Sequence, residues 1–400
     1  MDLEMPALPS DEDQPLARQA SELSREVRFG LVLYGGVSLA VYENGVVQEF
    51  FQASKGAGIY TILKHLADSD IVVDIVSGAS AGGINGVLLG YALANNLDLA
   101  SSAALWRDDG DILKLLHQPS DFPLNSALKS VDYFQKHLEQ AFTKFTAYAK
   151  QPNDLESAVE QLDLFVAGTN VYGHVYTEFD DLGEAIDVKN HRVTFHLRHS
   201  KALKAKSDLL HTKDLRAYAK LCRLTSAFPV AFEPVEVGAD NATPTEKQVD
   251  ELLIEWGRLT QTTNTFFLDG GILDNKPFSS TLRAIFHHTE TREVDRFLAY
   301  VEPDPERFLE KEGSRHSSPN VIESGGDGLS RLPSYQSIGA DLDQIADHND
   351  WAQRYRDIVE QIGEGARKNL QPPTGLSPVQ VSQDALYQRA RFSQVRGPCH

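Results

Sequence analysis

The segment VDIVSGASAGGING, residues 73–86, constrains the fold of this chain more than any other stretch. Its first half belongs to a β-branched run, residues 71–77, that is typical of a buried strand, and residues 81–95 have the apolar composition of a buried helix. Only small residues separate the two, so the chain passes from strand to helix in a tight turn. Such a connection is typical of a parallel sheet covered by helices.

The same order occurs at the beginning of the chain. Residues 26–34, EVRFGLVLY, read as a strand entering a buried sheet, and a Gly-Gly turn leads into helical spacing over residues 38–54. Further strands are expected at 162–169, 191–197, 265–268 and 296–301, the last of these being the last strand of the sheet. The sequence therefore predicts an α/β fold, with helices covering a mostly parallel central sheet.

Composition divides the 400 residues into four parts. Residues 1–25 are polar and acidic without apolar periodicity, which predicts a disordered tail. Residues 26–310 form the expected catalytic domain, residues 311–335 a flexible linker, and residues 336–400 a helix near 336–368 followed by a polar tail. Within the domain, residues 97–160 are mostly helical in pattern, with an apolar stripe that favours a core-packing helix over a lipid-facing lid: Phe134, Leu138, Phe142 and Phe145.

The overall charge limits the partners of the chain. The formal net charge is −19, which argues against nucleic-acid binding and against simple adsorption to anionic lipid. Residues 189–223 are locally basic, so they form either an ordinary solvated surface or a basic rim that attracts phosphate groups. With no signal peptide and no transmembrane segment recognisable, we expect a cytoplasmic protein, with peripheral membrane contact as an addition. The two cysteines, Cys222 and Cys399, do not suggest a disulfide scaffold or a cysteine-rich metal site.

Ser80 is the candidate nucleophile. It stands at the centre of G-x-S-x-G, with Gly78 and Gly82 leaving room on either side and a strand and a helix in the order that a nucleophile elbow requires. A serine hydroxyl needs a base to accept its proton. His287 and His288 have a suitable position along the chain, but they lie in an ordinary helix and its end, and are expected to be satisfied or solvent-exposed.

The better candidate for the base is an acid. The segment LDGGILDNKPF places Asp269 at the end of a short apolar strand, followed by Gly270 and Gly271, which allow the backbone to turn sharply and approach another loop. A solvated β-turn is the ordinary alternative for such a segment. Asp274, five residues further on, is a second acid that is expected to cap or turn the segment.

The loop after the first strand supplies a third element. Gly35 and Gly36, together with Val37, present backbone N–H groups at the start of a helix, where they can stabilise an oxyanion or cradle a phosphate. The chain contains neither a P-loop nor a dinucleotide-binding glycine motif, so the oxyanion interpretation is favoured over a nucleotide-binding α/β domain.

Together, YGGVSLAVYENGV, SGASAGGING and LDGGILDNKPF resemble the patatin-like phospholipases, and more narrowly their bacterial patatin-related branch. The resemblance spans residues 27–305. It implies a three-layer α/β/α fold and a Ser–Asp dyad without histidine, with Ser80 as nucleophile and Asp269 as general base. It also matches Gly35 and Gly36 to the oxyanion glycines, and residues 224–235 to a small-residue stretch that packs near the site.

The function implied by the resemblance is hydrolysis of phospholipids or related lipid esters through an acyl-enzyme, without a metal or other cofactor. The alternative is a catalytically silent protein that keeps the fold for binding or regulation. Headgroup, acyl length and positional preference are left open by the sequence.

Overall fold

The computed structural model describes residues 25–36, 40–110, 112–117, 126–147, 157, 159–201, 208–211, 214–260, 264–288, 293–302 and 338–369. The chain divides into two compact units, Met1–Gln336 and Ser337–His400. The predicted N-terminal tail, except for its last residue, lies outside the described residues, and so do the linker and the polar C-terminal tail.

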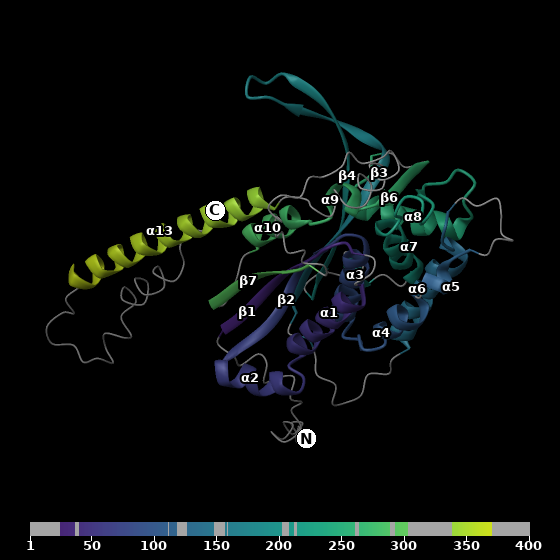
Figure 1. Ribbon diagram of the computed structural model, residues 1–400. Helices are drawn as coiled ribbons and strands as arrows, with labels where there is room; N and C mark the ends of the chain where they lie inside the picture. The colour runs from purple at the N-terminus through teal and green to yellow at the C-terminus, as the bar shows by residue number, and fades with distance from the viewer. Residues whose placement is uncertain are drawn as a thin grey trace, which may run out of the picture. The chain divides into compact units, whose positions relative to one another are not determined.

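The first unit is built on a seven-stranded sheet with the order β5-β6-β3-β2-β1-β7 and with β4 paired to β3 (Figure 1). Four strands are mutually parallel: β1 (Arg25–Leu33), β2 (Ser69–Gly78), β3 (Gln161–Phe179) and β7 (Glu293–Val301). Three pair antiparallel beyond β3: β4 (Ala185–Ser200), β5 (Val235–Val237) and β6 (Thr265–Asp269). The predicted α/β fold with a mixed, mostly parallel central sheet is confirmed, and the predicted last strand, β7, lies at its edge.

Helices cover both faces of this sheet. The side chain of Val76 on β2 is packed against Gly86 of α3 (Ser80–Asn95), where an added Cβ would lie 3.2 Å from it. The next side chain, Ser77, hydrogen-bonds to Thr281 of α10 (Phe278–His287) at 2.5 Å between the hydroxyl oxygens. Since successive strand residues point to opposite faces, α3 and α10 lie in different layers. The arrangement is consistent with the predicted three-layer α/β/α fold.

The remaining helices complete the layers. The helix α1 (Ala40–Lys55) packs beside α3, in agreement with the helical spacing of the sequence. The four residues of the predicted apolar stripe are all buried, so the helix α6 (Lys136–Thr146) with its preceding turn packs in the core as predicted. The other helices of this unit are α2 (Ile59–Ala67), α4 (Ser102–Ala104), α5 (Ile112–Leu115), α7 (Leu215–Thr225), α8 (Pro244–Gly257) and α9 (Gly271–Asp274), with irregular helical turns at Leu105–Asp109, Ser130–Gln135 and Leu209–His211.

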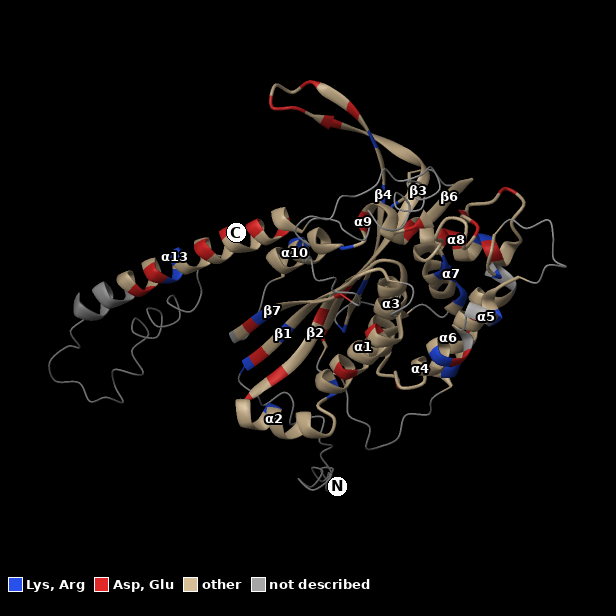
Figure 2. Cartoon of the chain, viewed as in Figure 1, with Lys and Arg blue, Asp and Glu red and all other residues tan. Residues whose placement is uncertain are grey.

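A long β-hairpin extends the two central antiparallel strands. The strands β3 and β4 continue well past the predicted 162–169 and 191–197 and remain paired out to Phe179 and Ala185. The hairpin projects beyond the rest of the sheet, and its tip is acidic (Figures 1 and 2). The Asp180 carboxylate accepts hydrogen bonds from the backbone N–H groups of Leu182 and Glu184, which fixes the turn.

A buried ionic cluster connects the sheet to the end of α10. The ring of His288 contacts Asp163 at 2.7 Å and Asp74 at 3.4 Å, and Asp74 is also paired with Arg28 and Arg296. The two carboxylates raise the pKa of His288 to about 9, against the lowering effect of burial. His288 is therefore a satisfied, ion-paired side chain, as the sequence predicts.

The second unit contains the helix α13 (Gly339–Asn369), close to the predicted 336–368. Within the described part of the chain, no helix is both long enough and apolar enough to cross a membrane.

Candidate active site

Ser80 occupies the turn between β2 and α3. Its φ of +52° lies in the left-handed region, which is strained for a serine and is the backbone feature of a nucleophile elbow. The neighbouring chain crosses very closely, because a Cβ on Gly82 would lie 2.3 Å from the carbonyl oxygen of Leu33. Only glycine fits there, and the turn as a whole leaves Ser80 7% exposed.

Asp269 lies beside Ser80 at the end of an antiparallel strand. It is the last residue of β6, which runs antiparallel to β3, with Asp269 opposite Gly168. The prediction that Asp269 ends a buried strand is confirmed, but the strand approaches against the direction of the parallel strands. The following turn needs glycine, because a Cβ on Gly270 would lie 2.1 Å from the carbonyl oxygen of Ala167.

The two side chains are in direct contact. The Ser80 hydroxyl donates to Asp269 Oδ2 at 2.8 Å, and the backbone N–H of Gly271 donates to the other carboxylate oxygen at 2.7 Å. Burial raises the pKa of Asp269 to about 7, while the hydrogen bonds from Ser80 and Gly271 and the charge of Arg223 act in the opposite direction. Among the described residues, no histidine hydrogen-bonds to Ser80 or to Asp269.

Thr225 supports both sides of this contact, and the sequence does not single it out. Its hydroxyl accepts from the backbone N–H of Ser80 at 3.1 Å and donates to the carbonyl of Ala167 at 2.7 Å. Its own carbonyl accepts from the N–H of Gly270 at 3.0 Å. Thr225 lies in the small-residue stretch 224–235 that the family resemblance places near the site.

Arg223 is the buried cation of the site. Its guanidinium lies 4.5 Å from the ring centre of Phe232 and donates to the backbone carbonyl of Glu233 at 2.8 Å. Burial lowers its pKa to about 10, so it remains charged at neutral pH. This charge favours the ionised form of Asp269. The sequence alone does not distinguish Arg223 from the other basic residues of the segment 189–223.

The glycine loop lies beside the nucleophile, but one of its predicted donors is occupied. A Cβ on Gly35 would lie 3.1 Å from Cβ of Ser80 and 2.2 Å from Oδ1 of Asn275. The N–H of Gly35 donates to the backbone carbonyl of Asn275 at 3.3 Å, and its role as an oxyanion donor stays a prediction. Gly36 follows it, and Val37 lies outside the described residues. The structure brings Asp269, and not Asp274, to Ser80.

The basic segment 189–223 does not form one continuous rim among its described residues. Arg192 donates to the backbone carbonyl of Leu273, in the turn that follows Asp269, whereas Arg198 pairs with Asp163 on the sheet. Lys220 pairs with Asp250 elsewhere. Of these, Arg192 is the one whose position is adjacent to the Asp269 turn.

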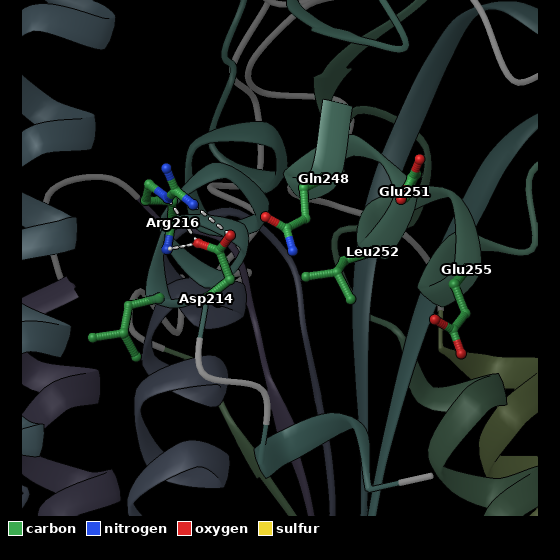
Figure 3. A pocket seen from close by; sticks show the side chains of 7 residues that line it. Asp214, Arg216, Gln248, Glu251, Leu252 and Glu255 are labelled. Carbon is green, nitrogen blue, oxygen red and sulfur yellow. Dashed lines mark hydrogen bonds and ion pairs between the residues drawn. The ribbon is translucent and has the colours of Figure 1, made fainter. Parts of the chain in front are cut away.

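A separate cavity of about 710 Å³ lies between the beginning of α7 and α8 (Figure 3). Figure 3 shows the ion pair of Asp214 with Arg216 on one side and Gln248, Leu252 and two glutamates of α8 on the other. Neither Ser80 nor Asp269 lines it, and Asp214 caps the first turn of α7. The cavity therefore contributes no group to the serine–aspartate pair.

The structure thus brings together, in an α/β fold, a serine on a strand-to-helix elbow, an aspartate at 2.8 Å from its hydroxyl and a glycine loop beside them. The chain belongs to the patatin-like phospholipase family, whose model matches residues 31–282. It is also similar to an uncharacterized membrane protein, Rv3479, of Mycobacterium tuberculosis, with 27% identity over 372 residues. The match covers 86% of this chain and 34% of that protein, so the chain spans about a third of the length of this relative.

Proposed function

We propose that the chain is a serine acyl hydrolase that cleaves phospholipids or related lipid esters with Ser80 and Asp269. Membership of a lipid hydrolase family supports the reaction class. The single observation that carries the proposal is the 2.8 Å hydrogen bond from the Ser80 hydroxyl to a buried carboxylate of raised pKa. A base with a pKa near the working pH transfers protons efficiently in both directions.

In the proposed reaction, Asp269 accepts the Ser80 proton as the hydroxyl oxygen attacks the ester carbonyl. The tetrahedral oxyanion is stabilised by backbone N–H groups of the loop that includes Gly36 and Val37, each contributing on the order of 3 kcal/mol. The protonated Asp269 then donates to the leaving alcohol, and an acyl-Ser80 ester remains. Water, activated by the same carboxylate, hydrolyses this ester and restores the free serine.

Two substitutions test the dyad. Ser80→Ala removes the nucleophile and Asp269→Asn removes the base while keeping the side-chain shape, so each is expected to lower kcat/KM for short-chain p-nitrophenyl esters by about 10³-fold or more. Asp274→Asn is the matched control, since it neutralises an acid of the same loop that does not contact Ser80, and it should retain activity. Circular dichroism and thermal unfolding verify the fold of each variant. Near-wild-type turnover in either dyad variant contradicts the proposal.

We further propose that the β3–β4 hairpin gives peripheral contact with the surface of a membrane. Gly168 of β3 pairs with Asp269, and the residues of β3 that follow form one strand of the hairpin. The hairpin therefore leaves the sheet at the strand ends where Ser80 and Asp269 lie (Figure 1). Near its tip, Phe179 is 72% and Leu182 89% exposed. Side chains of this size are normally buried, and exposed groups of them mark interaction surfaces.

The double substitution Phe179→Asp with Leu182→Asp tests this contact. Loss of the two apolar anchors is expected to weaken co-sedimentation with phosphatidylcholine vesicles at least tenfold, while hydrolysis of a soluble short ester is unchanged. Asp181→Asn changes the charge of the tip without changing its apolar area, and should bind within about twofold of the wild type. Equal vesicle binding by the wild type and the double variant contradicts the proposal.

A further inference from the structure

A second cluster of chemically active side chains lies at the end of β4. His199 and Asp208 are buried and His211 is exposed, and one potential ligand atom from each lies within 4.8 Å of the others. Nδ1 of His199 is 2.6 Å from Oδ2 of Asp208, and the two imidazole rings are 5.2 Å apart between centroids. His199 is the second-to-last residue of the strand β4, His211 ends the short helical turn Leu209–His211, and Asp208 comes immediately before that turn.

We propose that His199, Asp208 and His211 bind one zinc ion. Two imidazoles and one carboxylate are ligands that zinc prefers, at about 2.0–2.2 Å from each donor atom. Bound zinc replaces the proton shared by His199 and Asp208, and a small closure of His211 completes three protein ligands. The cluster borders a cavity of about 460 Å³, which gives water access to the fourth position.

The surroundings of the cluster favour a cation. The lining of the adjoining cavity is polar and largely uncharged, with Asn95, Asn96, Ser157 and Ser200 beside the three proposed ligands. Among the described residues lining the cavity, Lys201 is the one cationic side chain, and it is exposed to solvent. Its repulsion of a metal ion is therefore weakened by screening.

The other histidine–aspartate cluster of the molecule provides the contrast. Asp163 contacts both His196 and His288, which is a similar set of donors. There, however, the guanidinium of Arg198 lies 3.4 Å from the same carboxylate, and further arginines surround the adjoining Asp74. That cluster is neutralised by protein cations, whereas no lysine or arginine among the described residues is paired with the carboxylate of Asp208.

The proposed site is distant from the reaction. His199 pairs with Leu162 on β3, six residues before Gly168, which corresponds to roughly 20 Å along the strand. The turn that carries His211 is fixed to two helices: Asn95 of α3 donates to the carbonyl of Leu210, and Tyr218 of α7 donates to that of Leu209. Zinc would join this turn to β4, so it is expected to stabilise the folded protein. The proposed hydrolysis still needs no metal.

Zinc titration of the full-length protein after treatment with a chelator tests the site. The wild type is expected to bind one Zn²⁺ per chain by competition with a chromophoric chelator, and zinc is expected to raise its thermal unfolding midpoint by several degrees. His211→Ala, at an exposed position, and Asp208→Asn, which keeps an acceptor for the N–H of Leu210, should each weaken binding at least tenfold.

His65→Ala is the matched control, because it removes an exposed histidine from α2. It should bind zinc and respond to it like the wild type. The proposal is overturned if the wild type takes up no more zinc than His211→Ala, or if zinc raises the unfolding midpoint of the wild type and of Asp208→Asn equally. It is also overturned if Mg²⁺ displaces the bound zinc at similar concentration, because such a site would be an oxygen-type site.

Discussion

At the scale of single residues, the site joins side chains that are 189 positions apart in the sequence. The strained backbone of Ser80 points its hydroxyl at Asp269. The Thr225 hydroxyl accepts from the backbone N–H of Ser80, and the backbone N–H of Gly271 donates to the carboxylate of Asp269. The energy of this strain is balanced by the packing of the turn, in which glycine lets two backbone segments approach. The environment of Asp269 is therefore as important as its identity, because burial sets its pKa.

The raised pKa of Asp269 predicts the pH dependence of activity. A base acts in its ionised form, so kcat/KM should rise with pH up to about 7 and level off above it. An aspartate of ordinary pKa would instead give a constant rate from pH 5 upward. Initial rates with a soluble ester between pH 5 and 9 measure this profile, and a flat profile across pH 6–8 contradicts the assignment of Asp269 as the base.

The same shift affects stability with a defined sign. Because the folded-state pKa lies above that of the unfolded chain, folded Asp269 retains a proton between about pH 4 and pH 7 that the unfolded chain has released. Its contribution to the free energy of unfolding therefore decreases as pH rises through this window. In Asp269→Asn, which has no titrating group at this position, this part of the pH dependence of the unfolding free energy should be absent.

Sequence motifs singled out Ser80 and Asp269 but not the residues that surround and support them. Ser80 and Asp269 could be predicted because the glycines around them are required locally by tight turns. Thr225 and Arg223 could not, since a buried threonine and a basic residue in a helix are common, and their roles depend on tertiary contacts. The hydrogen bond of Gly35 to Asn275 likewise depends on a loop that is distant in sequence.

At the scale of elements, the buried strands and the helices beside them agree with the apolar patterns of the sequence. The outer halves of β3 and β4 were missed because they form an exposed hairpin, whose residues show no burial pattern. The direction of β6 could not be predicted either, because the sequence of a strand of five residues is the same whether it enters the sheet parallel or antiparallel.

The ionic cluster between the sheet and α10 gives a prediction at this scale. His288→Gln leaves Asp74 and Asp163 without their shared cation, and should lower the free energy of unfolding by on the order of 2 kcal/mol at pH 7. Since the folded-state pKa of about 9 is above the ordinary value, this contribution is complete below about pH 6.5 and is lost as pH rises through 9. Urea unfolding at several pH values measures it.

The adjacent His287 provides the control. It is exposed at the end of α10, so His287→Gln is expected to change the unfolding free energy by less than about 0.5 kcal/mol at every pH. Equal destabilisation by the two substitutions would contradict the structural role of His288.

At the scale of the whole molecule, the family match ends at residue 282, and both Ser80 and Asp269 lie within it. The strand β7 follows the match and completes the sheet beside β1, so the folded unit extends past the matched region. The helix α13 belongs to a second unit. Ser80 and Asp269 both lie in the first unit, so the proposed hydrolysis is a proposal about that unit.

Labelling with a fluorophosphonate tests the central claim most directly, because the probe reacts with an activated serine and requires no knowledge of the natural lipid. We expect intact mass spectrometry to show one adduct per wild-type chain, peptide mapping to locate it at Ser80, and Asp269→Asn to label at least 100-fold more slowly. Ser80→Ala should remain unlabelled. A folded wild-type protein that acquires no adduct, or a Ser80→Ala variant that labels like the wild type, would contradict the account.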